Sequence, residues 1–396
     1  MYWDKKYEDF RAGVRDFAER VVGPLAVEID QTQRFPRELL KPLAEEGYLG
    51  MVVSKKYGGS GFETLQYAIA VEEFSRICGS TGITIAAHNS LGLWPIFAFG
   101  TEEQKRKYLP RACSGELLAF GLTEPGAGSD AGGTKTRAVY DGEKWTINGA
   151  KCWITSATEC FAATITAKTS DEPGSYGISS FIVEKDMPGF SAGKKEDKLG
   201  LRGSDTAFLH LSDVDVPPEN QLGETGEGFK QFMMTLDGGR ISIGAMAIGL
   251  GQAALDDAAN HAVKLDQAGF KLSENQGIAF KLADMVTELE AARGLVYKTA
   301  MMKDEGLPFS MTSAQAKLFA SEVGTRCAAN AIGILGAEGL RVGDHPSERA
   351  WRDVKLCEIG EGTSEIQRIV ISRQLLKDYS EQLEPAKENV AEPVAG

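Results

Sequence analysis

A chain of 396 residues, of which 42% are hydrophobic, can bury a substantial core and exceeds the size at which a single core usually stops growing. Its net charge of −13 argues against nucleic acid or an anionic membrane as a partner, because phosphate groups are bound through clustered Lys and Arg. The sequence shows neither a signal peptide nor a segment of transmembrane length, and its six cysteines form no CxxC pair. We therefore expect a cytoplasmic globular protein of two or three packing units, with buried reduced thiols and no metal site.

The N-terminal part of the chain, residues 1–118, predicts a helical domain. Apolar residues recur there at the spacing of a helix face that packs against a core. They are Phe10, Val14, Phe17 and Val21 in a first stretch, and Tyr67, Ala70, Val71 and Phe74 in a second. Residues 57–61, which read Tyr-Gly-Gly-Ser-Gly, predict a loop between the two stretches.

Residues 119–228 predict a small antiparallel β domain, because short β-rich runs follow one another between turn signals. The runs are residues 145–147, 163–166, 178–183, 209–211 and 214–216. The turn signals that we expect to separate strands are Asp141-Gly142, Asn148-Gly149 and Pro217-Pro218.

Residues 229–381 predict helices again. The longest apolar stripe in this part consists of Ile278, Leu282, Val286, Leu289 and Val296. Residues 382–396, rich in Glu, Pro, Ala and Lys, predict a disordered tail. Helices, then a sheet, then helices indicate an α+β fold of three consecutive domains.

One carboxylate near the C-terminus stands on a glycine turn: Glu361 lies between Gly360 and Gly362. Glycine tolerates backbone angles that clash for other residues, so such a turn can hold a carboxylate with a flat ligand pressed against it. Thr363 and Ser364 behind the turn can cap the helix that follows. These features also describe an ordinary helix N-terminus, and the turn alone does not decide between the two interpretations.

Two further motifs lie in the predicted β domain. Residues 122–130, Leu-Thr-Glu-Pro-Gly-Ala-Gly-Ser-Asp, leave backbone N–H groups and hydroxyls available to a pyrophosphate or the polar edge of a ring. Residues 151–155, Lys-Cys-Trp-Ile-Thr, place an indole beside a hydroxyl. Residues 195–204 follow, and then residues 236–240, which read Leu-Asp-Gly-Gly-Arg.

These motifs and the Glu361 turn, in this order and on this domain plan, resemble those of the acyl-CoA dehydrogenase family. The resemblance covers residues 1 to about 380 and is closest to the short-chain and branched-chain members. It implies an N-terminal α-helical domain, a middle antiparallel β domain and a C-terminal four-helix bundle. It also implies an FAD cofactor whose ring lies between the β domain and the C-terminal helices.

The resemblance assigns eight residues to the cofactor. In the family, Thr123 and Thr155 would hydrogen-bond the flavin ring, Trp153 would pack near it, and Ser129 would lie by phosphate. The full set is Leu122, Thr123, Gly128, Ser129, Trp153, Ile154, Thr155 and Thr363.

The activity implied is the α,β-dehydrogenation of an acyl-CoA thioester, in which a base removes the α-proton and the β-hydrogen leaves as hydride to flavin. The base in most members corresponds to Glu361, and burial beside an apolar acyl chain should raise its pKa. The backbone N–H of the base would be one of two donors to the thioester carbonyl. The residues implied on the substrate side are Ser129, Asp237, Arg240, Gly360 and Gly362.

Four single positions bear on this prediction. A minority of members carry the base just before the arginine of the 236–240 motif, but Gly239 occupies that position here. Many members have a tyrosine where this chain has Gly360, so the acyl site has room for a branched or cyclic group. Gly82 aligns with the arginine that would pair the distal carboxylate of a glutaryl group, which disfavours that substrate. For His88 we favour a structural role over one in the acyl pocket.

Two motifs that in the family hold the FAD of a neighbouring subunit are altered. Arg-x-x-Phe-Gly is replaced by residues 265–269, Leu-Asp-Gln-Ala-Gly, and Gln-Ile-Leu-Gly-Gly by residues 333–337, Gly-Ile-Leu-Gly-Ala. Two assemblies therefore stay open: a homotetramer that holds FAD by other contacts, and a heteromer with a second family member. Electron-transfer flavoprotein is the implied electron acceptor.

Two other functions remain as alternatives to dehydrogenation. One is a flavin-containing, non-redox acyl-CoA lyase of the desulfinase type, which keeps the fold and the cofactor. The other is a cofactor-poor partner subunit without activity of its own. Retention of Trp153, Thr155 and Glu361 argues against the second.

Overall fold

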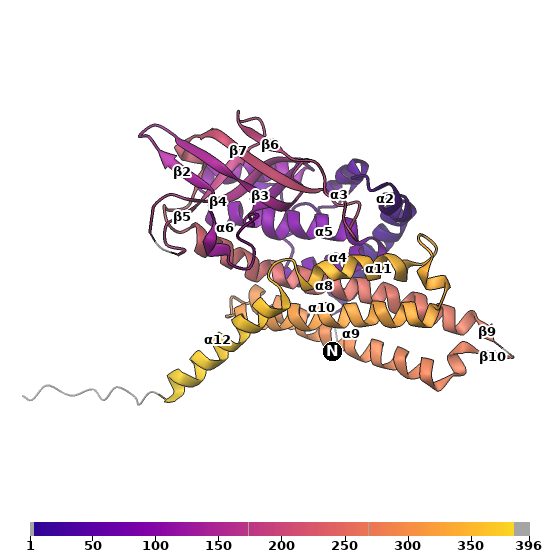
Figure 1. Cartoon of the computed structure of the whole chain (residues 1–396). Helices are drawn as coiled ribbons and strands as arrows, with labels where there is room; N and C mark the ends of the chain where they lie inside the picture. The colour runs from indigo at the N-terminus through magenta and orange to yellow at the C-terminus, as the bar shows by residue number, and fades with distance from the viewer. Residues whose placement is uncertain (1–3, 173, 268, 384–396) are drawn as a thin grey trace, which may run out of the picture.

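The computed structural model describes residues 4–172, 174–267 and 269–383 (Figure 1). The sheet and most of the N-terminal helices lie on one side of a layer of long C-terminal helices, and α12 (Ser364–Leu383) extends from that layer (Figure 1). The three parts follow one another in the order that the sequence predicts, as an α+β fold.

The N-terminal part is helical. The π-helical turn η5 (His88–Leu93) joins α5 to α6 without a loop. The helices are α1 (Lys5–Phe17), α2 (Ala26–Thr32), α3 (Leu40–Glu45), α4 (Thr64–Ile77), α5 (Gly79–Ala87), α6 (Trp94–Phe99) and α7 (Glu102–Cys113). Both predicted apolar stretches lie on helices, the first running from α1 into the π-helical turn that follows it and the second on α4. Because α4 is buried on almost every side, it is an interior helix rather than a surface one.

The middle part is an eight-stranded sheet with the order β6-β7-β3-β2-β4-β5-β8 and with β1 paired to β4. Most pairs are antiparallel, as predicted, whereas β1 and one residue pair of β2 run parallel to β4. The strands are β1 (Leu117–Gly121), β2 (Arg137–Tyr140), β3 (Trp145–Thr155), β4 (Cys160–Lys168), β5 (Ile178–Glu184), β6 (Phe190–Ala192), β7 (Thr206–Val216) and β8 (Gln221–Leu222).

One predicted turn is wrong. Asn148 and Gly149 lie inside β3, where the register with β7 shifts between Ile147 and Gly149. An ideal Cβ on Gly149 would overlap Thr136, so the glycine permits a close approach within the sheet instead of reversing the chain. The other two signals, at residues 141–142 and 217–218, do follow strands.

The C-terminal part contains three long helices, α8 (Gly228–Lys264), α9 (Gln276–Asp304) and α10 (Ser310–Leu335), followed by α11 (Pro346–Val354) and α12 (Ser364–Leu383). Strands β9 (Asp266–Gln267) and β10 (Phe270–Lys271) form a small hairpin between α8 and α9. Within the predicted stripe on α9, Leu289 and Val296 are buried but Val286 is exposed. Of the predicted disordered tail, residues 384–396 lie outside the described residues, and α12 continues to Leu383.

The core explains where a site can form. One large apolar cluster is shared by the N-terminal helices and by α8, α9 and α10, whereas the sheet has its own cluster. The two helical parts are therefore one packing unit, and the sheet rests against it.

All six cysteines are buried and free, as predicted. Among the described residues, no helix is long and apolar enough to cross a membrane.

Candidate active site

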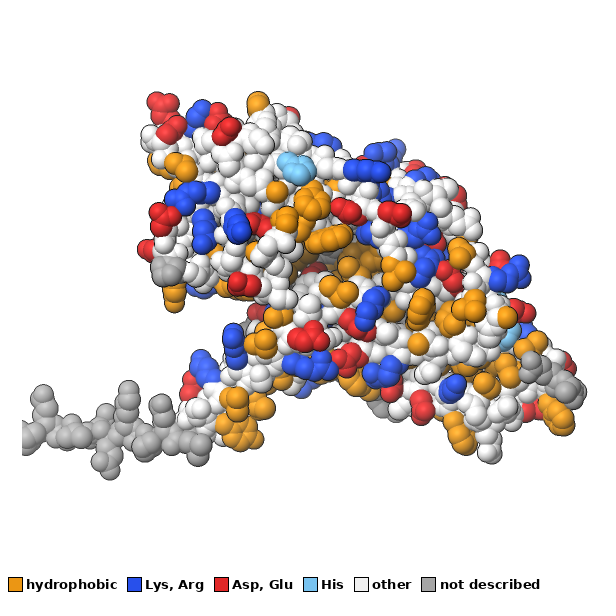
Figure 2. Space-filling model, viewed as in Figure 1, with side chains coloured by type: hydrophobic (Ala, Val, Ile, Leu, Met, Phe, Trp, Pro, Cys, Tyr) orange, Lys and Arg blue, Asp and Glu red, His pale blue; other side chains and the backbone are white. Residues whose placement is uncertain are grey.

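A cavity of about 780 Å³ opens between the sheet, α5, α8 and the segment that precedes α12. This face of the molecule is hollowed between the sheet and the C-terminal helices, with apolar side chains around the hollow (Figure 2). The predicted site residues that line the cavity are Leu122, Thr123, Gly128, Ser129, Trp153, Ile154, Thr155, Arg240, Gly360, Glu361, Gly362 and Thr363. Residues more than 200 positions apart in the sequence therefore meet in one space.

Asp237 is the predicted site residue that does not line the cavity. It lies one turn before Arg240 on α8, and its carboxylate is ion-paired with the Arg240 guanidinium. Arg240 is buried, and its Nε has no hydrogen-bond partner among the described residues. Asp237 therefore orients a cation that faces the cavity rather than facing the cavity itself.

The Glu361 turn has an uncommon backbone. Glu361 has a φ of 57° and Gly362 a φ of 95°, so a residue with a Cβ occupies the left-handed region next to a glycine that adopts it freely. The hydroxyl of Thr363 accepts from Ile366 N–H at 3.4 Å and caps α12, as predicted. Ser364, the other predicted cap, is instead the first helical residue, and its hydroxyl has no partner among the described residues.

The Glu361 carboxylate is set up to exchange a proton. Its Oε2 is buried and has no hydrogen-bond partner among the described residues. Burial raises the pKa of Glu361 to about 8, while the positive charges of Lys317 and Arg240 act in the opposite direction. The predicted direction of this pKa shift is confirmed, and the value suits a general base near neutral pH.

Gly239 lies directly against this carboxylate. An ideal Cβ built on Gly239 would overlap Oε2 and the carboxyl carbon of Glu361. The sequence shows only that no second carboxylate stands at position 239. The structure adds that the space of the absent side chain is filled by the Glu361 carboxylate.

The loop of residues 122–130 is anchored by a buried ion pair that the sequence analysis missed. Lys151 of β3 is fully buried, and its ammonium donates to the Glu124 carboxylate at 2.7 Å. Glu124 also accepts from the backbone N–H of Lys135 at 2.6 Å and of Thr136 at 3.1 Å. A single lysine followed by apolar residues in a β-rich segment is the signal that could have revealed this pair.

Trp153 forms part of the cavity wall. Its φ is 59° and its side chain is 61% exposed, although its neighbours Cys152 and Ile154 on the same strand are buried. An apolar ring of this size on the wall of a cavity offers a flat surface to a ligand. Thr155, two residues further on, pairs with Thr206 on β7 at the end of the strand.

His88 serves the fold. It is fully buried, its Nδ1 accepts from Leu118 N–H at 3.3 Å, and its Nε2 lies 3.2 Å from the carbonyls of Leu49 and Ala112. Burial lowers the pKa of His88 to about 4, so the ring is neutral. These contacts agree with the structural role that we favour from the sequence.

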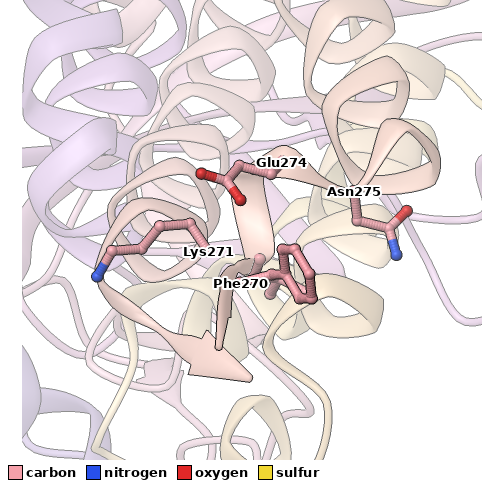
Figure 3. Close-up of a pocket in the computed structure, with 5 residues that line it drawn as sticks. Phe270, Lys271, Glu274 and Asn275 are labelled. Carbon is pink, nitrogen blue, oxygen red and sulfur yellow. The ribbon is translucent and has the colours of Figure 1, made fainter. Parts of the chain in front are cut away.

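A second hollow, of about 310 Å³, lies at the β9–β10 hairpin and contains none of the predicted site residues. Phe270, Lys271, Glu274 and Asn275 surround it (Figure 3). The residues that line this hollow come directly after residues 265–269 in the chain, which are the first of the two altered family motifs. Ala268 of that motif lies outside the described residues.

Three family models match consecutive parts of the chain. The acyl-CoA dehydrogenase N-terminal domain matches residues 4–116, the middle domain residues 119–214, and the C-terminal domain residues 226–376. The chain belongs to the acyl-CoA dehydrogenase family. The family is one of FAD-dependent oxidoreductases.

Individual relatives agree with this assignment. A protein of Bacillus subtilis named "Probable acyl-CoA dehydrogenase YngJ" is 50% identical over 375 residues, which are 94% of this chain and 98% of that protein. The butyryl-CoA dehydrogenase of Megasphaera elsdenii has a TM-score of 0.92 at 43% identity, over 95% of this chain and 99% of that one. A structure described as the electron transferring flavoprotein of Acidaminococcus fermentans contains a chain with a TM-score of 0.93 at 44% identity, over 96% of this chain and all of that one.

The residues of the cavity fit the family cofactor. Thr123, Ser129 and Thr155 provide hydroxyls on one wall, and Trp153 provides an exposed ring beside them. Gly128 faces open space, since no described atom lies within 4 Å of an ideal Cβ there. A flavin site needs polar groups that can hydrogen-bond the edge of the ring, a flat apolar surface beside the ring and room for the ring to approach the backbone closely.

Proposed function

We propose that this protein is an acyl-CoA dehydrogenase that desaturates a short, branched or cyclic acyl-CoA thioester between its α and β carbons, with Glu361 as the base. The observation that carries the proposal is the Glu361 Oε2, which is buried, unpartnered among the described residues, and in the same cavity as the predicted cofactor residues. A buried carboxylate without a partner is unfavourable unless a ligand completes its surroundings.

The proposed proton transfer uses only this carboxylate. The thioester α-carbon would lie against Glu361, and the α-proton would pass to the carboxylate when the base is ionised. A pKa of about 8 makes the carboxylate basic enough to accept that proton, and the charges of Lys317 and Arg240 keep a fraction of it ionised near neutral pH. The Glu361 N–H would donate to the thioester carbonyl and stabilise the negative charge that develops there.

The cofactor would supply the redox part. When bound, FAD accepts the β-hydrogen of the substrate as hydride. The residues that would hold it are Leu122, Thr123, Gly128, Ser129, Trp153, Ile154, Thr155 and Thr363. The Lys151–Glu124 pair would keep the loop of residues 122–130 in place while the ligand binds and leaves.

The substrate class follows from the lining of the cavity. Beside the charged groups of the site, α5, η5, α8 and the segment before α12 contribute apolar side chains to the lining, among them Ile83, Ala87, Leu91, Leu236, Ile243 and Leu356. An ideal Cβ on Gly360 would have Leu356 as its nearest neighbour, at 3.5 Å, so the missing tyrosine ring leaves space on this side. Position 82 faces Ser75 of α4, in a contact between helices, and offers no charge to the distal carboxylate of a glutaryl group.

Replacing the base tests the proposal. Glu361→Gln should lose essentially all turnover, while the purified protein keeps its flavin absorbance and still binds acyl-CoA. A variant that retained most of its activity would contradict the assignment of the base. Anaerobic bleaching of the wild-type flavin by butyryl, isovaleryl and cyclohexanoyl thioesters separates dehydrogenation from a non-redox lyase, which would leave the flavin oxidised. A colourless purified protein would instead indicate a cofactor-poor subunit.

The partners belong to the same proposal. We expect electron-transfer flavoprotein as the acceptor, which the similarity to the chain from Acidaminococcus fermentans supports. We expect a homotetramer, or a heteromer in which a second family member supplies the contacts missing at residues 265–269 and 333–337. Stoichiometric flavin in a homotetramer of the chain purified alone would remove the need for a second subunit. The cytoplasmic location stays a prediction.

A further inference from the structure

The backbone carbonyls of the Glu361 turn are held by two buried side chains from different helices. Gln367 of α12 donates its Nε2 to the Glu361 carbonyl at 3.1 Å and to the Gly362 carbonyl at 2.8 Å. Lys317 of α10 donates its Nζ to the same Gly362 carbonyl at 2.6 Å. Both Lys317 and Gln367 are 0% exposed. Neither is among the residues that line the cavity.

Lys317 is an unusual residue to bury in this manner. Among the described residues, the Lys317 ammonium donates its hydrogen bond to a backbone carbonyl, whereas the ammonium of the buried Lys151 forms an ion pair with the Glu124 carboxylate. A buried ammonium is costly unless a negative charge lies nearby, and burial lowers the pKa of Lys317 to about 8. The nearby carboxylates whose negative charge favours its ammonium form are those of Glu361 and Glu358. Of these, Glu361 is the one that lines the cavity.

The two side chains act on the conformation that the base needs. A φ of 57° is unfavourable for a residue with a Cβ, so the turn requires contacts that hold it. Hydrogen bonds to the carbonyls of Glu361 and Gly362 fix the two peptide planes that follow the base. With these planes fixed, the Glu361 side chain leaves the backbone in one direction, toward Gly239 and the cavity.

We propose that Lys317 and Gln367 are positioning residues that clamp the base turn from behind, and that Lys317 also supplies a buried positive charge that favours the ionised form of Glu361. The inference rests on the proposed function, because it has meaning only if Glu361 is the base. The clamp sets the direction of the carboxylate, and the charge sets the pH at which the carboxylate can accept a proton.

The effect of the Lys317 charge on the pKa of Glu361 has a predictable sign. Its ammonium lowers the pKa of Glu361, so removing it must raise that pKa and move the rise of activity to higher pH. Removing Gln367 changes no charge and should leave that pKa in place. The other charged or titratable groups near this pair are Arg240 on α8, Tyr67 on α4, Cys357 and Glu358 before the turn, and Glu365 in the first turn of α12.

The test uses the FAD-loaded enzyme and the variants Lys317→Met, Lys317→Arg and Gln367→Met. We expect Lys317→Met and Gln367→Met to lower kcat by about tenfold or more with little change in KM, since the loss concerns geometry in the transition state. Only Lys317→Met should raise the pKa in the pH profile of kcat/KM. Lys317→Arg keeps the charge and should keep the wild-type profile.

Two control variants lie on the same helices. Ser321→Ala removes a buried hydroxyl of α10 that bonds only Leu318 within the described residues, and Gln374→Met removes an exposed amide of α12 that bonds Asp378. Both should retain wild-type kcat. Thermal unfolding, flavin stoichiometry and affinity for a non-reactive CoA thioether provide readouts besides activity.

The outcomes separate the clamp from the proposed function. If Glu361→Gln is inactive while Lys317→Met and Gln367→Met keep wild-type kcat and pH profile, the positioning role of Lys317 and Gln367 is wrong. The assignment of Glu361 as the base is then unaffected. If Glu361→Gln keeps its activity, the proposed function is wrong. If Lys317→Met fails to fold, Gln367→Met and Lys317→Arg still decide: wild-type kcat in Gln367→Met, or a shifted profile in Lys317→Arg, would overturn the proposal.

Discussion

The residues that line the cavity match the family motifs, whereas residues 265–269 at the β9–β10 hairpin and residues 333–337 depart from them. At the cavity, the motif residues are retained, and side chains from β3, α8 and the turn before α12 converge on one space. At residues 265–269 and 333–337, the side chains that would reach a neighbouring subunit are replaced by Leu265, Ala268 and Gly333. We infer from this difference that the chemistry and the assembly can vary independently: the proposed site residues all belong to one chain, whereas the altered residues concern contacts with a neighbouring subunit.

The strongest test of the cavity side is Gly239→Ala. Its methyl group would overlap the Glu361 carboxylate, so we expect kcat to fall by about a hundredfold or more through displacement of the base. Gly238→Ala is the matched control, because its added Cβ meets only the flexible end of Lys303. Alanine favours the helix at both positions, so a loss confined to position 239 identifies the carboxylate as its cause. Equal activity of the two variants would contradict the close contact.

Removing the anchor of the 122–130 loop should mainly affect stability. Lys151→Met leaves the Glu124 carboxylate buried without its cation, and we expect the free energy of unfolding to fall by about 3–5 kcal/mol, with weaker FAD binding. Lys144→Met, which breaks the exposed pair between the residue just before β3 and Asp215 of β7, should change little. Chemical denaturation and flavin titration measure both effects. Similar losses in the two variants would argue against a special role of the buried pair.

The pH dependence of the free enzyme follows from the raised pKa of Glu361. The base must be ionised, so kcat/KM should rise with pH, about tenfold per unit below the pKa, and level off above about 8. The profile is measured with the most active thioester of the substrate panel. A rise that is complete below pH 6 would contradict a pKa of about 8 for Glu361 in the free enzyme.

The smallest effect is expected from restoring the neighbour-facing side. Leu265→Arg and Gly333→Gln reintroduce groups that the family uses to hold FAD, and an added Cβ on Gly333 meets no described atom within 4 Å. A charge-assisted hydrogen bond to phosphate is worth about 1.5–3 kcal/mol, so FAD should bind at least about tenfold more tightly if the chain forms a homotetramer. Flavin titration of the apoprotein measures this change. Unchanged affinity would favour a second kind of subunit beside the FAD.

The sequence predicts most of the fold because its signals are local. Helical spacing on α1 and α4 and β-rich runs on β3, β4, β5 and β7 need no knowledge of the partner surface. The prediction of a turn at Asn148-Gly149 failed for the opposite reason: Gly149 lies against Thr136, the residue before β2, at an irregularity in the register of β3 and β7. The parallel pairing of β1 with β4 likewise depends on where α7 delivers the chain.

The sequence by itself determined the family, the three-part α+β order and, with the exception of Asp237, predicted site residues that do line the cavity, because motifs and periodicity are written in neighbouring residues. Only the tertiary structure placed the Glu361 carboxylate against Gly239, buried Lys151 beside Glu124, and brought Lys317 and Gln367 behind the base. Those pairs join distant parts of the chain, and their effects on pKa and backbone conformation arise from burial, which a sequence pattern does not contain.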